Sequence, residues 1–75
     1  MSRDIDRDYG VVRKWNVVKA YGFITPDGGG HDVFIHIRGV KDGQALVPGQ
    51  RVSYFLAPDR LDRSKVMATD AVVVK

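Results

Sequence analysis

Hydrophobic positions in this chain follow the two-residue period of β-strands. In segment 50–57, Val52, Tyr54 and Leu56 occupy every second position. The alternate positions hold Arg51, Ser53 and Phe55. Such alternation is typical of a strand with one buried face. Because no window of about 11 residues places apolar side chains at helical spacing, the pattern predicts strands and turns only.

Five segments rich in β-branched and aromatic residues are separated by turn signals. We predict strands over residues 9–18, 20–25, 32–37, 50–57 and 66–74. The turn signals are Pro-Asp-Gly-Gly-Gly at 26–30, a glycine-containing loop over 38–49 and a charged loop over 58–65. Residues 1–8 are mostly charged, and we predict that they form a flexible lead-in to a single domain spanning 9–75.

Five short strands in a chain of 75 residues favour closure into a small β-barrel. An open sheet would leave two unpaired edges and one apolar face in water, whereas closure buries one side of every strand. Side chains then alternate between the interior and the outside. The small and β-branched residues suit a narrow interior, which we expect to hold Gly22, Ile24, Val33 and Ile35. The opposite parity places Tyr21, Phe23, Phe34 and His36 outside.

An exposed aromatic cluster of this kind indicates a binding surface. The chain has only three Phe, three Tyr and one Trp, and three of these rings would lie together beside a histidine. Rings at strand spacing can stack on nucleic-acid bases, each stacked base contributing about 1–3 kcal/mol. Basic residues on or near the same strands could contact phosphates: Arg13, Lys14, Lys19 and Arg38. With the reverse strand parity, the same rings would instead form the core.

Residues 19–24 and 33–36, K-A-Y-G-F-I and V-F-I-H, resemble the paired motifs K-G-F-G-F-I and V-F-V-H of the cold-shock domain family. The resemblance covers roughly residues 9–74. It implies an all-β, five-stranded antiparallel OB-fold barrel that binds single-stranded RNA or DNA by base stacking. RNA-recognition motif domains share a similar first motif, but they require two helices, and this sequence predicts none.

The resemblance assigns roles residue by residue. Tyr21 and Phe23 match the two stacking aromatics of the first motif, and Phe34 and His36 match those of the second. Lys19 matches the motif lysine, which the resemblance implies contacts phosphate. Two further positions either contact base edges or shape turns: Asn16 and Asp32.

The chain departs from the family pattern at the end of the first strand. The family reads K-W-F-N, whereas this chain reads R-K-W-N over residues 13–16, so Lys14 takes the position of a surface tryptophan. Trp15 either reaches that surface through a local bulge or packs at the barrel rim. Ile37 and Arg38 replace an aromatic and a small residue, and residues 41–45 carry no ring. We therefore predict weaker binding with a larger electrostatic share and a steeper salt dependence.

The composition of the chain indicates what kind of partner it binds and argues against several classes of protein. The net charge of +3 and pI of about 9.5 favour a phosphate-bearing partner. The nine acidic residues are all aspartate, which favours turns over helices. The chain has no cysteine, and it shows neither a run of about 20 apolar residues nor a signal-peptide pattern. We expect a cytoplasmic, monomeric protein with no membrane association.

Catalytic and metal sites find little support in the sequence. His31 and His36 are the only histidines, and two imidazoles without cysteine or glutamate are too few for a typical metal site. The three serines lack a plausible histidine partner. We expect no enzyme activity, no cofactor and no small-molecule substrate. The sequence instead predicts low-specificity single-strand binding of the RNA-chaperone kind, with a small OB-fold protein–protein interaction module as the alternative.

Overall fold

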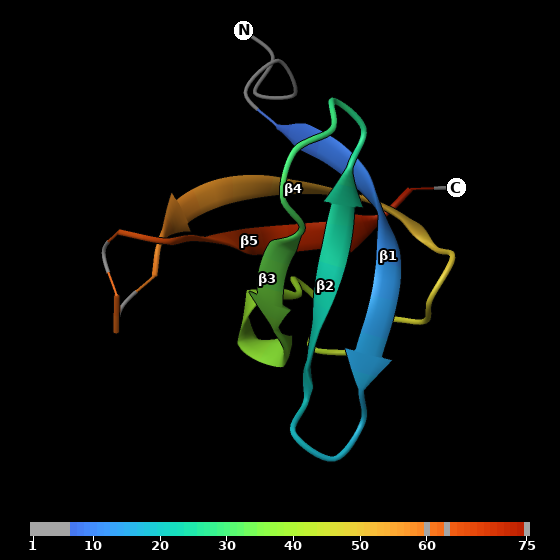
Figure 1. Ribbon diagram of the computed structural model, residues 1–75. Helices are drawn as coiled ribbons and strands as arrows, with labels where there is room; N and C mark the ends of the chain where they lie inside the picture. Colours follow the sequence, from blue (N-terminus) through green and yellow to red (C-terminus); the bar gives the residue numbers. More distant parts are fainter. Residues whose placement is uncertain (1–6, 60, 63, 75) are drawn as a thin grey trace, which may run out of the picture.

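A computed structural model describes residues 7–59, 61, 62 and 64–74, which form a closed five-stranded barrel (Figure 1). The strands are β1 (Asp8–Asn16), β2 (Tyr21–Pro26), β3 (Val33–His36), β4 (Arg51–Pro58) and β5 (Val66–Val73). A one-turn 3-10 helix, η2 (Ile37–Gly39), follows β3. The order around the barrel is β1-β2-β3-β5-β4, and the β4–β5 ribbon crosses behind β1, β2 and β3 in Figure 1. The all-β barrel predicted from the sequence is confirmed.

The strands are mixed, which corrects the expectation of a purely antiparallel barrel. The β3–β5 contact is parallel and pairs Phe34 with Met67, and a parallel bridge joins Val40 to Ala71. All other strand contacts are antiparallel. The reason is geometric, because strand directions cannot alternate all the way around a closed ring with an odd number of members. Closure of five strands therefore requires at least one parallel contact.

The barrel interior contains the residues that strand parity predicts. Ile24, Val33 and Ile35 are buried in one core, and Gly22, which pairs with Ile35 across β2 and β3, is also buried. The rest of that core comes from β1, β4, β5 and the segment between η2 and β4: Val12, Val40, Leu46, Val52, Tyr54, Ala68 and Ala71. The outward parity of the β2 and β3 aromatics follows from this inward set.

Strand β1 ends two residues earlier than the predicted segment 9–18. The side-chain Oδ1 of Asn16 accepts hydrogen bonds from the N–H groups of Val18 and Lys19, each at 3.0 Å. These two backbone N–H groups therefore bind the asparagine side chain and not a neighbouring strand, which is typical of asparagine in turns. Val17 and Val18 are consequently exposed in the turn despite their β-branched side chains.

The alternation predicted for segment 50–57 fails from Ser53 onward. Ser53 is buried, whereas Leu56 is 46% exposed. The cause is a register shift between Ser53 and Phe55 in the β4–β5 pairing, which turns the following side chains to the other face. Nothing in the local sequence pattern marks that irregularity.

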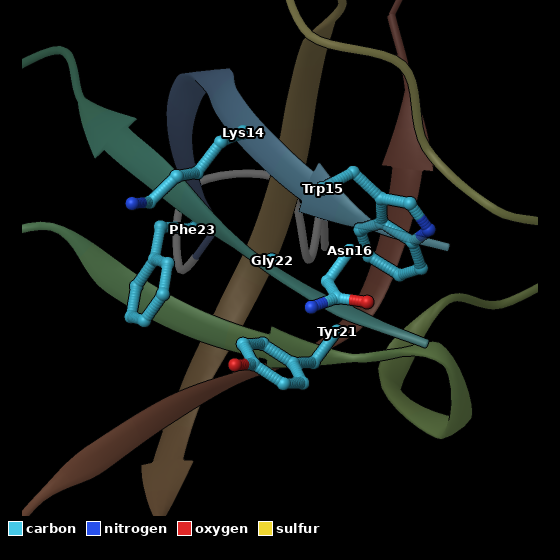
Figure 2. A pocket seen from close by; sticks show the side chains of 6 residues that line it. All are labelled: Lys14, Trp15, Asn16, Tyr21, Gly22 and Phe23. Carbon is cyan, nitrogen blue, oxygen red and sulfur yellow. The ribbon is translucent and has the colours of Figure 1, made fainter. Parts of the chain in front are cut away.

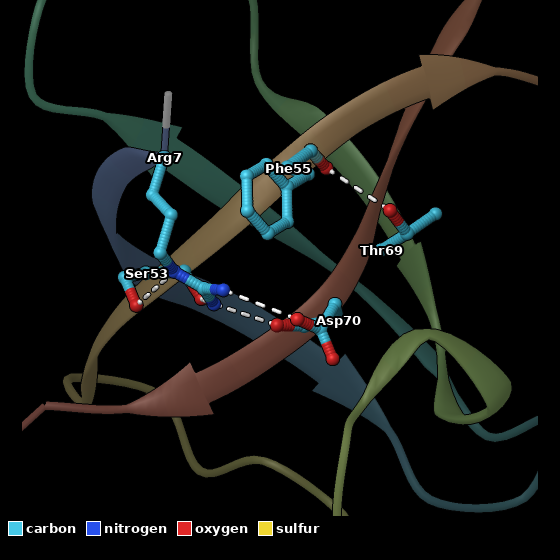
Figure 3. A network of polar contacts seen from close by, with 5 residues as sticks. All are labelled: Arg7, Ser53, Phe55, Thr69 and Asp70. Atoms are coloured by element: carbon cyan, nitrogen blue, oxygen red, sulfur yellow. Dashed lines mark hydrogen bonds and ion pairs between the residues drawn. The ribbon is translucent and has the colours of Figure 1, made fainter. Parts of the chain in front are cut away.

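Arg7 holds this irregular region together (Figure 3). Its Nε donates to the Ser53 hydroxyl at 3.0 Å, and its Nη2 donates to the Ser53 and Asp70 carbonyls at 2.9 and 2.6 Å. Its Nη1 pairs with Asp70 Oδ2 at 3.1 Å, and the guanidinium lies 4.6 Å from the Phe55 ring centroid. Asp70 has a positive φ of 52°, so the guanidinium contacts stabilise a strained backbone position.

Two residues of the predicted lead-in 1–8, Arg7 and Asp8, are among those that the structure describes. Arg7 makes the contacts above, and Asp8 already begins β1, where it pairs with Tyr54 of β4. Residues 1–6 lie outside the described residues, so flexibility of that segment remains a prediction.

Ala20 occupies a backbone conformation that suits glycine. Its φ is 60°, its N–H donates to the Asn16 carbonyl at 2.8 Å, and its own carbonyl accepts from Ile37 at 2.9 Å. The resembled motif K-G-F-G-F-I has glycine here. A Cβ in the left-handed backbone region costs about 1–2 kcal/mol. Glycine relieves this strain but makes the unfolded chain more flexible, so Ala20→Gly is expected to raise the free energy of unfolding by only about 0.5–1 kcal/mol. Thermal unfolding should show a midpoint higher by about 3–6 °C. Ala45→Gly, in a loop with ordinary φ, should not raise the midpoint, and an equal rise in both variants would contradict the explanation.

Gly22 allows β2 to lie directly against β1. A Cβ there would stand 2.3 Å from the Lys14 carbonyl oxygen and 2.7 Å from Cε3 of Trp15. The clash could be relieved only by moving the β1 backbone away from β2. Gly22→Ala should therefore destabilise the barrel by about 2–3 kcal/mol, measured by urea unfolding. Gly28→Ala is the matched control, since a Cβ there meets nothing within 4 Å. Equal stability of the two variants would show that β1 and β2 are not this close.

Candidate nucleic-acid interface

Strand pairing aligns the outward side chains of four strands in one row. Lys14 of β1 pairs with Phe23 of β2, Phe23 with Phe34 of β3, and Phe34 with Met67 of β5. A second, shorter row beside it contains Asn16, Tyr21 and His36. We call the surface formed by Tyr21, Phe23, Phe34 and His36 the aromatic face.

The three rings of the aromatic face contact one another. Tyr21 and Phe34 are tilted by 37° with centroids 5.5 Å apart, and Phe23 lies edge-on to both at 6.1 and 6.0 Å. All three side chains are half-buried, whereas their chain neighbours Gly22, Ile24, Val33 and Ile35 are buried. The rings therefore point outward, as the strand parity predicted, and they brace each other in fixed orientations.

Lys14 joins this face because β1 contains a bulge. The pairing of β1 with β2 shifts between Val12 and Lys14, so Arg13 is an extra residue without a partner on β2. The shift brings Lys14 opposite Phe23, and its Nζ lies 5.9 Å from the centroid of that ring. Figure 2 shows both side chains on the same side of the sheet. A cation thus stands at the end of the aromatic row.

The same bulge directs Trp15 away from the aromatic face. Trp15 pairs with Gly22, which has inward parity, and its indole is partly buried against the core. Figure 2 shows the indole on the opposite side of β1 from Lys14 and Phe23. Its Nε1 is buried without a hydrogen-bond partner among the described residues. The sequence left open whether Trp15 reaches the outer surface or packs at the barrel rim, and in the structure it packs at the rim.

A pocket of about 270 Å³ lies between β1 and β2 at this end of the face (Figure 2). Its lining combines the Lys14 ammonium, the Asn16 amide and the rings of Tyr21 and Phe23. Asn16 Oδ1 is already used by the β1–β2 turn, so this residue shapes the turn as well as lining the pocket. Lys19 is exposed in the same turn.

His36 and Arg38 lie at the other end of the shorter row. The Arg38 N–H donates to His36 Nδ1 at 3.1 Å, which fixes the imidazole at the start of η2. An imidazole that accepts at Nδ1 carries the proton of its neutral form on Nε2. Arg38 itself is exposed on η2.

Asp32 acts first as a structural residue of the β2–β3 turn. Its Oδ2 pairs with the Arg13 guanidinium, and its Oδ1 accepts from the Thr25 hydroxyl at 3.2 Å. Arg13 is therefore partly neutralised and is less available to phosphate than Lys14. The Arg13 contact ties the turn to the bulged part of β1, and the Thr25 contact ties it to β2.

Two features of this surface were not found by sequence reasoning. Met67 continues the row beyond Phe34, and a cleft of about 550 Å³ separates Phe34 from the β4–β5 loop. That loop contributes Asp59 and Lys65 to the cleft, and the first residue of β5 contributes the Val66 side chain. Residues so distant in sequence meet through the parallel β3–β5 contact, which no local pattern indicates.

Two titratable groups with shifted pKa values lie away from the aromatic face. Burial, with the nearby charges of Asp8 and Asp27, raises the pKa of Tyr54. Hydrogen bonds from the Ser64 hydroxyl and backbone N–H lower the pKa of Asp62. Within the described residues there is no group of three or more potential metal ligands. The same part of the chain has no helix long and apolar enough to cross a membrane.

Comparison with known proteins agrees with the architecture. Residues 8–73 match the family described as the "Cold-shock" DNA-binding domain. A probable cold shock protein of Sinorhizobium fredii is 43% identical over 63 residues, covering 81% of this chain and 88% of that protein. Cold shock protein CspA of Rhizobium meliloti is 42% identical over 52 residues, covering 67% and 75%. Cold shock protein CapA of Pseudomonas fragi is 46% identical over 50 residues, covering 64% and 78%. The chain therefore belongs to the cold-shock domain family and has a nucleic-acid-binding function.

Proposed function

We propose that the protein binds single-stranded RNA or DNA with low sequence specificity, by stacking bases on the aromatic face. The observation that carries this proposal is the row of outward rings, Phe23 and Phe34, with Tyr21 against both. Fixed rings lose little freedom when a base stacks on them, so the contact energy is retained. Every base has a π-face, which makes such stacking tolerant of sequence.

We expect the ligand to be single-stranded because stacking requires accessible base faces. In a duplex the base faces are covered by their neighbours, and only the edges are accessible in the grooves. An unpaired strand can turn its bases onto the protein while its phosphates remain in water or meet cations. Three exposed cations would meet those phosphates: Lys14 beside Phe23, Lys19 in the β1–β2 turn and Arg38 in η2.

Low-specificity stacking supports an RNA-chaperone-like role. A base held on Phe34 or Phe23 is unavailable for intramolecular pairing, so binding shifts folded RNA toward open forms. The shift needs no nucleotide hydrolysis, since preferential binding to one state is sufficient. The proposal includes a monomer that acts in the cytoplasm and does not catalyse a reaction; His36 then serves as a ring in the shorter row beside Tyr21.

Replacement of one central ring tests the stacking surface. Phe34→Ala should weaken binding of a labelled single strand of about eight nucleotides by about tenfold or more, because one stacked base is worth about 1–3 kcal/mol. Fluorescence anisotropy measures the change. Tyr9→Ala is the control: this ring is 36% exposed on β1 and lies 5.4 Å from the Arg51 guanidinium, outside the aromatic face. Equal effects of the two variants would contradict base stacking on β3.

Lys14 should make binding unusually sensitive to salt. One phosphate contact contributes about 0.7 to the slope of log affinity against log salt for single strands. Lys14→Gln should lower the slope by about that amount and weaken binding at low salt. Lys14→Trp should lower the slope equally, yet strengthen binding at high salt by supplying a ring beside Phe23. If the slope of log affinity against log salt is unchanged in both variants, Lys14 does not contact a phosphate.

A further inference from the structure

The aromatic face ends in a cleft whose walls differ from the rest of the surface. Phe23 and Phe34 form one apolar side, and Val66, at the start of β5, lies across from them. The β2–β3 turn and the β4–β5 loop supply the polar margin: His31, Asp32, Asp59 and Lys65. The space of about 550 Å³ is continuous with the rings on which bases are proposed to stack.

The polar margin contains two carboxylates, of Asp32 and Asp59, beside one ammonium and one imidazole. An ionised carboxylate only accepts, and it provides about four lone-pair sites. Asp32 uses both of its oxygens within the protein, toward Thr25 and Arg13. Asp59 accepts from the Leu61 N–H through Oδ1 at 2.8 Å, a contact that orients the carboxylate and uses one site. Asp59 is therefore the acceptor best suited to a bound ligand.

The loop that carries Asp59 is held by its own backbone. Asp59 N–H donates to the Lys65 carbonyl at 2.9 Å, and Lys65 N–H donates to the Asp62 carbonyl at 3.0 Å. These bonds place the Asp59 carboxylate and the Lys65 ammonium on the same margin. A negative and a positive group thus border one apolar slot.

A flat ring with donors on its edge fits such a slot. Cytosine, adenine and guanine carry an exocyclic amino group, whereas thymine and uracil have two carbonyl oxygens flanking one N–H. An aspartate accepts from the amino group of cytosine and faces an oxygen in thymine. The ammonium can meet the phosphate of the same nucleotide.

We propose that this cleft is a nucleobase pocket that prefers bases with an exocyclic amino group, with Asp59 as the acceptor and Lys65 as the phosphate contact. The proposal rests on the single-strand binding proposed above. It adds one selective position to an otherwise sequence-tolerant surface.

The test compares oligo-dC with oligo-dT, each of about eight nucleotides, by fluorescence anisotropy at neutral pH. Asp59→Asn keeps an oxygen for Leu61 but presents an amide to the base, so the dC-to-dT affinity ratio should fall by about fivefold relative to the original protein. Asp62→Asn is the matched control, because it removes the same charge from the same loop but lies outside the cleft. Its ratio should not change. Lys65→Gln should weaken both oligonucleotides alike.

A change on the ligand provides a second readout that is independent of protein stability. Oligo-dC with N4,N4-dimethylated bases has no amino donors, so the unaltered protein should bind it no better than oligo-dT. An unchanged ratio in Asp59→Asn, or full binding of the dimethylated strand, would overturn the pocket while leaving the stacking function intact. No binding of either unmodified oligonucleotide would instead refute the proposed function itself.

Discussion

The pairing of β2 with β3 is the constraint on which the rest of the structure depends. It fixes Ile24 opposite Val33 inside the barrel and Phe23 opposite Phe34 outside it. A shift of one residue would exchange the two faces completely, because side chains alternate strictly along a strand. One register therefore decides both the core that stabilises the barrel and the surface that meets nucleic acid.

Local patterns predict the parts of this structure that depend only on local geometry. The parity of residues 21–24 and 33–36 could be read directly, because small and β-branched residues alternate with aromatic ones. The parallel contact between Phe34 and Met67 could not, because it depends on how the whole ring closes. The exposed Leu56 was mispredicted for a related reason: a bulge changes the parity without a sequence mark.

The end of β1 shows how a bulge and a substitution combine at the candidate interface. Arg13 is the extra residue, and it moves Lys14 to the outer face and Trp15 to the inner one. The sequence identified both residues but left the position of the indole open. Gly22 explains why the indole can pack on the inner side, since a side chain at position 22 would leave no space for Trp15. The surface consequently has a cation, Lys14, directly beside the Phe23 ring.

The seam between β3 and β5 is the thinnest part of the barrel wall, with one paired position in the strands and the Val40–Ala71 bridge beyond it. A wall with few backbone hydrogen bonds opens at lower cost than the rest of the molecule, so its amides should exchange with solvent first. The row from Phe23 through Phe34 to Met67 crosses this seam. A strand bound along that row would clamp the two halves together, so ligand binding and resistance to local opening are linked.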